Sequence, residues 1–189
     1  MTTIPLCLPD SITPEQFLSE YWQKRPLLIK QGLPQLIDMF EPDDMLGLAL
    51  EEDASARLLT QAASKQEGLP QWQLKKSPLT ETDFDNLPEQ WTVLVQNLEQ
   101  WSPELGQLWQ AFDFIPQWQR DDIMVSYAPK GGSVGKHYDD YDVFLAQGYG
   151  QRRWQLGKFC DKNTEFVADE PIRLFDDMGE IIFDEILEA

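Results

Sequence analysis

Histidine and cysteine are scarce in this sequence of 189 residues, which contains one histidine, His137, and two cysteines, Cys7 and Cys160. The two cysteines lie far apart and lack the close spacing that is typical of a zinc site. The sequence therefore argues against a disulfide-dependent secreted fold and predicts a reducing, cytoplasmic location.

Basic residues are also few, with 15 lysines and arginines against 33 acidic residues and a net charge of −18. This balance argues against direct binding to nucleic acid, which requires a basic patch. It favours a cationic partner through electrostatic steering, although an acidic surface that only maintains solubility explains the charge equally well. The first ten residues lack the pattern of a signal peptide and no apolar run reaches membrane-spanning length, so we expect no membrane partner.

What the sequence does contain is enough apolar material for a core: hydrophobic residues make up 42% of it, and seven are tryptophan. A capping-box pattern at Thr13, with Pro14 and Gln16 after it, predicts the start of a helix. We predict helices at residues 13–25, 42–50 and 102–112, and short strands at residues 27–30, 57–61, 72–76 and 91–96. Few helices among many short strands favour a mainly β fold with flanking helices, arranged as a double-sheet jelly roll.

The most informative stretch runs from residue 124 to residue 157. Strands are predicted at 123–128, 142–147 and 151–156, with a glycine-rich loop after the first and a tight turn before the last. His137 and Asp139 stand between them in an H-x-D pattern, and residues two apart on a strand point to the same face. An imidazole and a carboxylate so placed supply two of the three ligands of the 2-His-1-carboxylate triad that binds non-haem Fe(II). The third ligand would be a second histidine, which this sequence lacks.

Several segments together resemble the JmjC-type cupin oxygenases, and within them the ribosomal oxygenases. The resemblance rests on the segments 21–29, 91–96, 131–135, 137–139, 141–144, 147–148 and 152–154. It implies a double-stranded β-helix that uses Fe(II) and 2-oxoglutarate to hydroxylate a residue of a basic ribosomal protein. In the bacterial members, that residue is an arginine of a large-subunit protein.

The resemblance also implies roles for three further residues. Arg152 is the arginine that points into the barrel toward the far carboxylate of 2-oxoglutarate, while Arg153 faces the other side, and two solvated arginines are the alternative. Ser126 matches a position that lines the cosubstrate pocket with a hydroxyl, although an ordinary strand serine explains it nearly as well. Tyr149 matches a position near the substrate side chain, with an exposed turn aromatic as the equal alternative.

Two carboxylates near the H-x-D pattern are expected to stay outside the metal site. Asp140 has the wrong parity to share the inward face of a strand. Asp142 is expected to have a structural role.

The missing histidine sets the expected extent of the domain. In the family, the second histidine lies on a later strand that would fall just past Ala189, and residues 180–188 are expected to lead into that strand. Residues 1–119 are then helices and strands that flank the barrel, and residues 120–189 are its metal- and cosubstrate-binding strands. The jelly roll would be incomplete at the C-terminus, and the dimerisation and winged-helix-like regions of a homodimeric full-length protein would be absent.

Three functions follow from this sequence. The first is an Fe(II)- and 2-oxoglutarate-dependent protein hydroxylase whose 189-residue form is inactive, because only two metal ligands are present. The second is a metal-free cupin that serves as a binding module. The third is a JmjC-type lysine demethylase, which uses the same metal site with a different substrate pocket.

Overall fold

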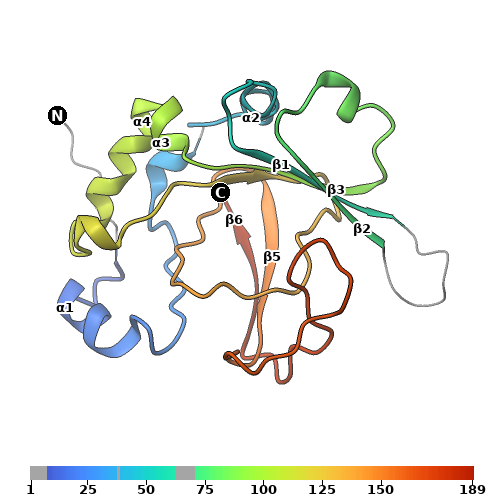
Figure 1. Ribbon diagram of the computed structural model, residues 1–189. Coiled ribbons are helices and arrows are strands. Elements are labelled where there is room, and N and C mark those ends of the chain that lie inside the picture. Colours follow the sequence, from blue (N-terminus) through green and yellow to red (C-terminus); the bar gives the residue numbers. More distant parts are fainter. Residues whose placement is uncertain (1–7, 38, 63–70) are drawn as a thin grey trace.

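The computed structural model describes residues 8–37, 39–62 and 71–189, which form two antiparallel sheets with short helices around them (Figure 1). The first sheet contains β1 (Ala56–Ala62), β2 (Gln71–Lys76), β3 (Gln90–Val95) and β4 (Val125–Tyr127), and the second contains β5 (Gln151–Leu156) and β6 (Phe183–Glu188). The α-helices are α1 (Pro14–Gln16), α2 (Pro42–Ala49), α3 (Leu98–Trp101) and α4 (Pro103–Gly106). A π-helical turn spans Phe17–Tyr21, and 3₁₀ turns span Pro34–Leu36, Glu81–Asp83, Gln107–Phe112 and Gln117–Gln119. The expected mainly β fold with flanking helices is therefore confirmed.

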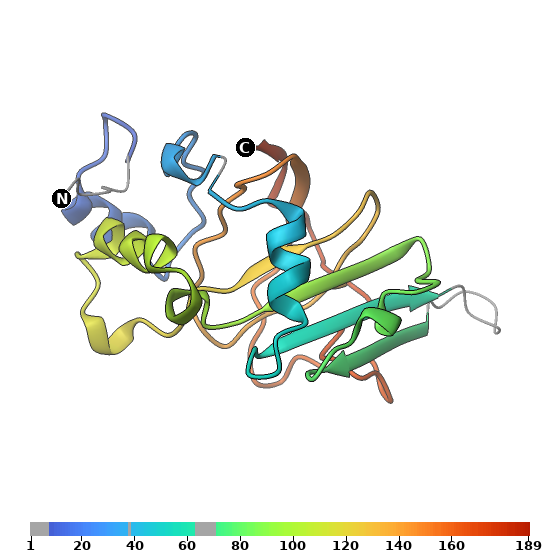
Figure 2. The same ribbon diagram turned by 90° about the horizontal axis from the view of Figure 1, so that it is seen from above.

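The four-stranded sheet has the order β2-β1-β3-β4 and buries one of its faces against α2 (Figure 2). Alternation along the strands turns Leu58, Val93 and Val95 toward that helix, where Met45 and Ala49 meet them. All five side chains are almost fully buried, and each large one contributes about 1.5–3 kcal/mol on leaving water. This layer is the main hydrophobic core of the described residues.

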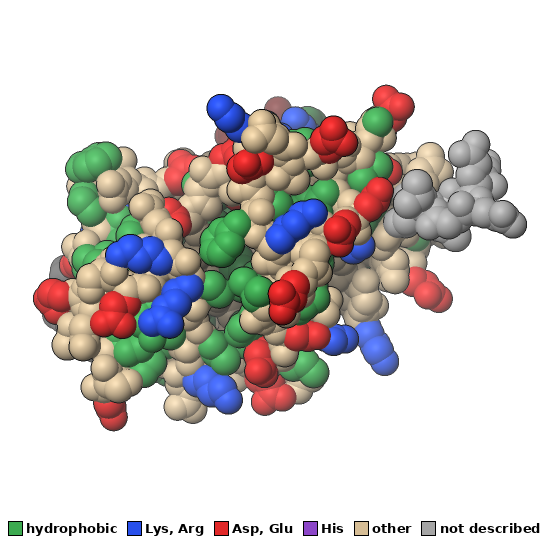
Figure 3. All heavy atoms as spheres, turned by 90° about the horizontal axis from the view of Figure 1, so that it is seen from below, with side chains coloured by type: hydrophobic (Ala, Val, Ile, Leu, Met, Phe, Trp, Pro, Cys, Tyr) green, Lys and Arg blue, Asp and Glu red, His purple; other side chains and the backbone are tan. Residues whose placement is uncertain are grey.

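The opposite face of this sheet looks toward β5 and β6, which lie on the side away from α2 in Figure 1. A second, smaller cluster of Leu59, Trp72 and Leu174 packs on this face. Next to the cluster, a wide cavity of about 2800 Å³ separates the two sheets. On the surface around the second sheet, hydrophobic side chains gather near the middle of the molecule with charged side chains around them (Figure 3).

The N-terminal helical segment begins with the predicted capping box. The Gln16 backbone N–H donates to Thr13 Oγ1 at 3.2 Å, and the Thr13 backbone N–H donates to Gln16 Oε1 at 2.9 Å. The helix then widens into the π-helical turn, which buries Phe17 and places it against Trp22 and Phe144. Trp22 and Phe144 stack with their ring centroids 5.5 Å apart. Aromatic packing thus fixes the segment around Phe144 against the N-terminal helices.

This packing explains one wrong prediction. Residues 142–147 read as an apolar strand, but they adopt no regular secondary structure in the described chain. Their apolar character comes partly from Phe144, which packs against Phe17 and Trp22 and takes no part in a sheet. Residues 27–30 were also predicted as a strand and are irregular.

The predicted strand at 123–128 is confirmed only over Val125–Tyr127, which forms the edge of the first sheet. The strand at 151–156 is confirmed at its full predicted length but belongs to the second sheet. The strands predicted at 123–128, 142–147 and 151–156 therefore do not form one antiparallel set, because the second is irregular and the other two lie in different sheets. Residues 183–188, expected only to lead into a strand, are themselves the strand β6.

Two further observations complete the fold. Cys160 carries a free thiol, while Cys7 lies outside the described residues. Within the described residues, no helix has both the length and the apolar character required to cross a lipid bilayer.

Candidate metal and cosubstrate site

The loop between β4 and His137 is fastened to the four-stranded sheet. The Gly132 backbone N–H donates to the Pro129 carbonyl oxygen at 2.9 Å, which closes a tight turn. A Cβ at Gly132 would collide with the Trp91 carbonyl oxygen, so glycine permits this close approach to β3. The fully buried Thr92 adds a hydrogen bond from its Oγ1 to the Ser133 carbonyl oxygen at 3.0 Å. The backbone that precedes the H-x-D pattern is thus held in place by the sheet.

Gly135 makes the last turn before the pattern. Its φ of +78° lies in the left-handed region, and a Cβ there would collide with Leu174 and crowd Trp72. The position therefore requires glycine for both its conformation and its packing.

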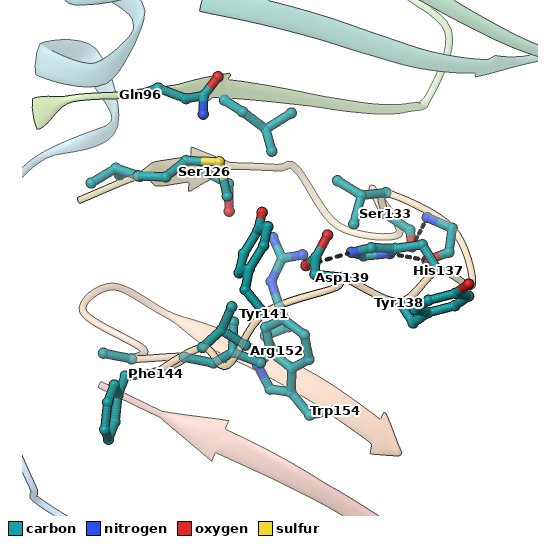
Figure 4. A pocket seen from close by; sticks show the side chains of 18 of the residues that line it. Gln96, Ser126, Ser133, His137, Tyr138, Asp139, Tyr141, Phe144, Arg152 and Trp154 are labelled. Atoms are coloured by element: carbon teal, nitrogen blue, oxygen red, sulfur yellow. Dashed lines mark hydrogen bonds and ion pairs between the residues drawn. The ribbon is translucent and has the colours of Figure 1, made fainter. Parts of the chain in front are cut away.

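The structure brings His137 and Asp139 together at the edge of the cavity (Figure 4). His137 Nε2 lies 3.8 Å from Asp139 Oδ2, and both side chains are about one third exposed. The residues stand on irregular backbone and not on the expected strand. Their side chains nevertheless share one side of the chain, because the His137 ring is anchored to the Gly135 carbonyl oxygen, 3.0 Å from Nδ1.

The contact between His137 Nδ1 and the Gly135 carbonyl oxygen determines which ring nitrogen is left for other partners. A carbonyl oxygen only accepts hydrogen bonds, so His137 Nδ1 is the donor, and the side of the ring that carries Nε2 is turned toward Asp139 and is available to a metal in the deprotonated form. Two electron-pair donors that face each other are suited to a shared cation. An imidazole nitrogen and a carboxylate oxygen fit a divalent transition metal such as Fe(II).

These two residues supply only part of such a site. Across residues 8–37, 39–62 and 71–189, no cluster of three or more His, Cys, Asp or Glu side chains could hold a metal. The nearby carboxylates are engaged elsewhere: Asp140 Oδ2 accepts from Arg173 at 3.0 Å, and Asp142 Oδ2 accepts from Gln23 at 2.8 Å. The donor set thus fits two positions of a facial triad and leaves the third without a ligand among the described residues.

The two adjacent arginines on β5 differ in their surroundings. Arg153 donates two hydrogen bonds to Asp184 on β6, both of 2.6 Å, and this ion pair raises the pKa of Arg153. Arg152 is half-buried, and desolvation lowers its pKa. Figure 4 shows Arg152 rising from β5 toward Tyr141 and Asp139, close to Trp154. Of the two guanidinium groups, the one on Arg152 is directed toward the pair formed by His137 and Asp139.

Ser126 and Tyr149 also line the cavity, at different places. Ser126 lies on β4 opposite Leu94 of β3, and its hydroxyl points into the space between the sheets (Figure 4). Tyr149 precedes β5 with 56% of its surface exposed, and its carbonyl oxygen accepts a hydrogen bond from Gln147. The structure gives their positions, and their binding roles remain predictions.

Tyr141 is a cavity residue that sequence reasoning did not single out for the site. Partial desolvation and the negative charge of Asp139 raise the pKa of Tyr141, although most of its surface is exposed. Its ring stands between Arg152 and Ser126 in Figure 4. The available signal was spacing, because Tyr141 continues the two-residue step from His137 through Asp139.

Comparison with known proteins relates this geometry to a family. Residues 107–189 match the JmjC domain. The chain is 62% identical over 187 residues to a probable ribosomal oxygenase of Haemophilus influenzae, covering 99% of this chain and 45% of that protein. It is 39% identical over 173 residues to the ribosomal protein uL16 3-hydroxylase of Escherichia coli, covering 91% of this chain and 44% of that protein.

Solved structures agree with the sequence comparison. An X-ray structure of Escherichia coli YcfD matches with a TM-score of 0.75 at 37% identity, over 94% of this chain and 45% of that one. YcfD in complex with cobalt and 2-oxoglutarate, described as a ribosomal oxygenase, matches with a TM-score of 0.74 at 36% identity, over 94% and 44% of the two chains. This chain spans less than half the length of these relatives. By sequence and by its mainly β architecture, the chain is similar to the ribosomal oxygenases, and it has the JmjC, or cupin, fold.

Proposed function

We propose that this chain is part of an Fe(II)- and 2-oxoglutarate-dependent hydroxylase that acts on an arginine of a large-subunit ribosomal protein. The observation that carries this function is the arrangement of His137 and Asp139. Their donor atoms face each other across 3.8 Å at the edge of a cavity into which the half-buried Arg152 also points.

Each of these residues has a defined task. His137, held in one tautomer by Gly135, and Asp139 would bind the metal. The guanidinium fork of Arg152 would hold the far carboxylate of 2-oxoglutarate, with the Ser126 hydroxyl as a second contact. Bound Fe(II), together with 2-oxoglutarate and O₂, supplies the oxidation of an unactivated C–H bond, and succinate and CO₂ are the coproducts.

The relatives and the charge of the chain support this function and its substrate class. One sequence match is named a uL16 3-hydroxylase, and one matching structure was solved with cobalt and 2-oxoglutarate. A net charge of −18 suits a basic ribosomal protein, because opposite charges steer association. Tyr149, exposed at the cavity, would lie near the substrate side chain.

A second function is favoured by one observation, the single histidine of the chain. A cupin without a complete triad would serve as a binding module that recognises a basic protein without oxidising it. Metal-dependent turnover separates these two functions.

The test is oxidation of a ribosomal protein by the protein that contains this chain. The enzyme would be incubated with Fe(II), 2-oxoglutarate, O₂ and the basic ribosomal protein, and the mass gain of one oxygen atom on an arginine would be measured. His137→Ala and Asp139→Ala should abolish it. Asp140→Ala should retain it, because Asp140 pairs with Arg173 at the surface and takes no part in the site. Binding of the ribosomal protein without any oxidation would favour the binding module.

A further inference from the structure

A row of four side chains crosses the cavity-facing side of the four-stranded sheet. The pairing registers align Arg57 of β1 with Lys76 of β2 on one side and with Leu94 of β3 on the other, and Leu94 with Ser126 of β4. Residues directly opposite one another on neighbouring strands share a face of the sheet. The row therefore places a lysine and an arginine side by side at one end and the Ser126 hydroxyl at the other, and all four residues line the cavity.

Among the described residues, Arg57 lacks the partners that a guanidinium normally has. Its Nε is buried and makes no hydrogen bond within the part of the chain that the structure describes. One terminal nitrogen lies 3.3 Å from Met124 Sδ, and a thioether is a weak acceptor. Among the described residues, no carboxylate forms an ion pair with Arg57 or with Lys76.

The two cationic residues, Arg57 and Lys76, also lie directly opposite each other on β1 and β2. Like charges directly opposite on neighbouring strands destabilise a sheet. Acidic side chains outnumber basic ones by 33 to 15 in this chain, so carboxylates are plentiful as partners. Lys75, Arg120, Arg153 and Arg173 each have such a partner. An unpaired Arg57 beside Lys76 on a cavity wall is the arrangement expected where a bound anion supplies the missing charge.

We infer that Arg57, with Lys76 beside it, forms a carboxylate-binding position on the β1–β2 wall of the cavity, separate from the one at Arg152 on β5. A guanidinium fork matches the two oxygens of a carboxylate, and a neighbouring ammonium adds a further charge. The carboxylate has two sources, a free dicarboxylate that enters the cavity or an acidic side chain of a bound polypeptide. Carboxylate binding can be measured without turnover, so its failure is distinct from a failure of the hydroxylase function.

Titrations of the folded protein, followed by NMR chemical shifts, would test this position. The probes are succinate, a short blocked peptide with one glutamate, and the same peptide with glutamine as a neutral control. Arg57→Gln should weaken binding of at least one carboxylate probe roughly tenfold or more, as expected when a charged hydrogen-bonding partner is lost. Lys76→Gln should weaken it less, because an ammonium makes a single point contact.

Arg153→Gln is the matched control, since it removes the same charge from an arginine that Asp184 already pairs. It should leave the affinity of both probes unchanged. Loss confined to succinate identifies the ligand as a free dicarboxylate, and loss confined to the glutamyl peptide identifies an acidic side chain of a polypeptide. Either loss supports the site.

Arg57→Lys is the control for misfolding, because it retains the positive charge while it removes the planar guanidinium group. With circular dichroism and melting temperature close to the wild type, Arg57→Lys should bind the carboxylate with intermediate affinity. Equal affinities of wild type, Arg57→Gln and Arg57→Lys for both carboxylate probes would overturn the assignment. Equal binding of the glutamyl and glutaminyl peptides would also overturn it if succinate does not respond.

Discussion

The two sheets that border the cavity differ in how their faces are used. In the four-stranded sheet, Val93 and Val95 of β3 are fully buried under α2. In the two-stranded sheet, Ile186 of β6 remains 60% exposed, and exposed positions alternate with half-buried ones along β5. The first sheet thus supplies the packed core, while the second presents side chains such as Arg152 to the cavity. The candidate site lies between the side of the first sheet that faces away from α2 and the partly exposed second sheet.

The largest expected contrast is in stability. Leu58→Ala removes a side chain that is 4% exposed in the core under α2, and it should lower the free energy of unfolding by about 2–5 kcal/mol. Ile186→Ala, at an exposed position of β6, should change it by no more than about 0.5 kcal/mol. Urea unfolding of both variants measures the difference. Similar losses would mean that the second sheet is as tightly packed as the first.

The next contrast lies within the second sheet, between its two arginines. In the protein with hydroxylase activity, Arg152→Ala should raise the KM for 2-oxoglutarate roughly tenfold or more, because it removes charged hydrogen bonds to the far carboxylate. Arg153→Ala breaks only the exposed pair with Asp184 and should have a much smaller effect. Steady-state kinetics of the two variants tests this. Equal effects of the two substitutions on this KM would show that Arg152 is not the arginine that binds 2-oxoglutarate.

The first sheet was also the easier one to predict from sequence. The segments of β1, β2 and β3 combine apolar residues with polar ones, with β-branched residues most frequent in β3, and these strands lie where predicted, to within one residue at every end. The capping signal at Thr13 was equally reliable, because a cap is a local contact between residues three apart.

The surroundings of the site were harder to predict because they depend on distant contacts. In the apolar segment around Phe144, this ring packs against Phe17, Trp22 and Phe112, none of which is near it in sequence. Likewise, the assignment of β4 and β5 to different sheets depends on the pairing of β5 with β6, about 30 residues further along the chain. The juxtaposition of His137 and Asp139 was anticipated from the parity of a β-strand, although both residues lie on irregular backbone.

A smaller effect is expected where the site loop joins the first sheet. Thr92→Val removes the hydrogen bond to the Ser133 carbonyl oxygen and should cost about 1 kcal/mol. Amide hydrogen exchange should also become faster in the loop at residues 131–135. Thr60→Val on β1, whose hydroxyl makes no comparable bond in the described chain, is the control. Unchanged loop exchange in Thr92→Val would show that the glycines alone hold the loop.

The smallest effect concerns the exposed pair on the second sheet. Hydrogen bonds from Arg153 and Gln155 lower the pKa of Asp184 from its ordinary 3.8 to about 2. Because the folded-state pKa is depressed, the stabilising contribution of Asp184 is complete above about pH 3.8 and is lost as the pH falls toward 2. Arg153→Gln should shift the Asp184 titration back upward, as measured by NMR of the carboxyl carbon. A titration that is the same in the variant and the wild type would contradict the pairing.

The central claim is that His137 and Asp139 are two ligands of an Fe(II) site that requires a further histidine. Turnover of 2-oxoglutarate with added Fe(II) tests it most directly, compared between the 189-residue chain and a longer chain that supplies a second histidine. We expect turnover only from the longer chain and its loss in His137→Ala and Asp139→Ala. Comparable turnover by the 189-residue chain would contradict the ligand requirement, and full activity of the longer His137→Ala or Asp139→Ala variant would contradict the site itself.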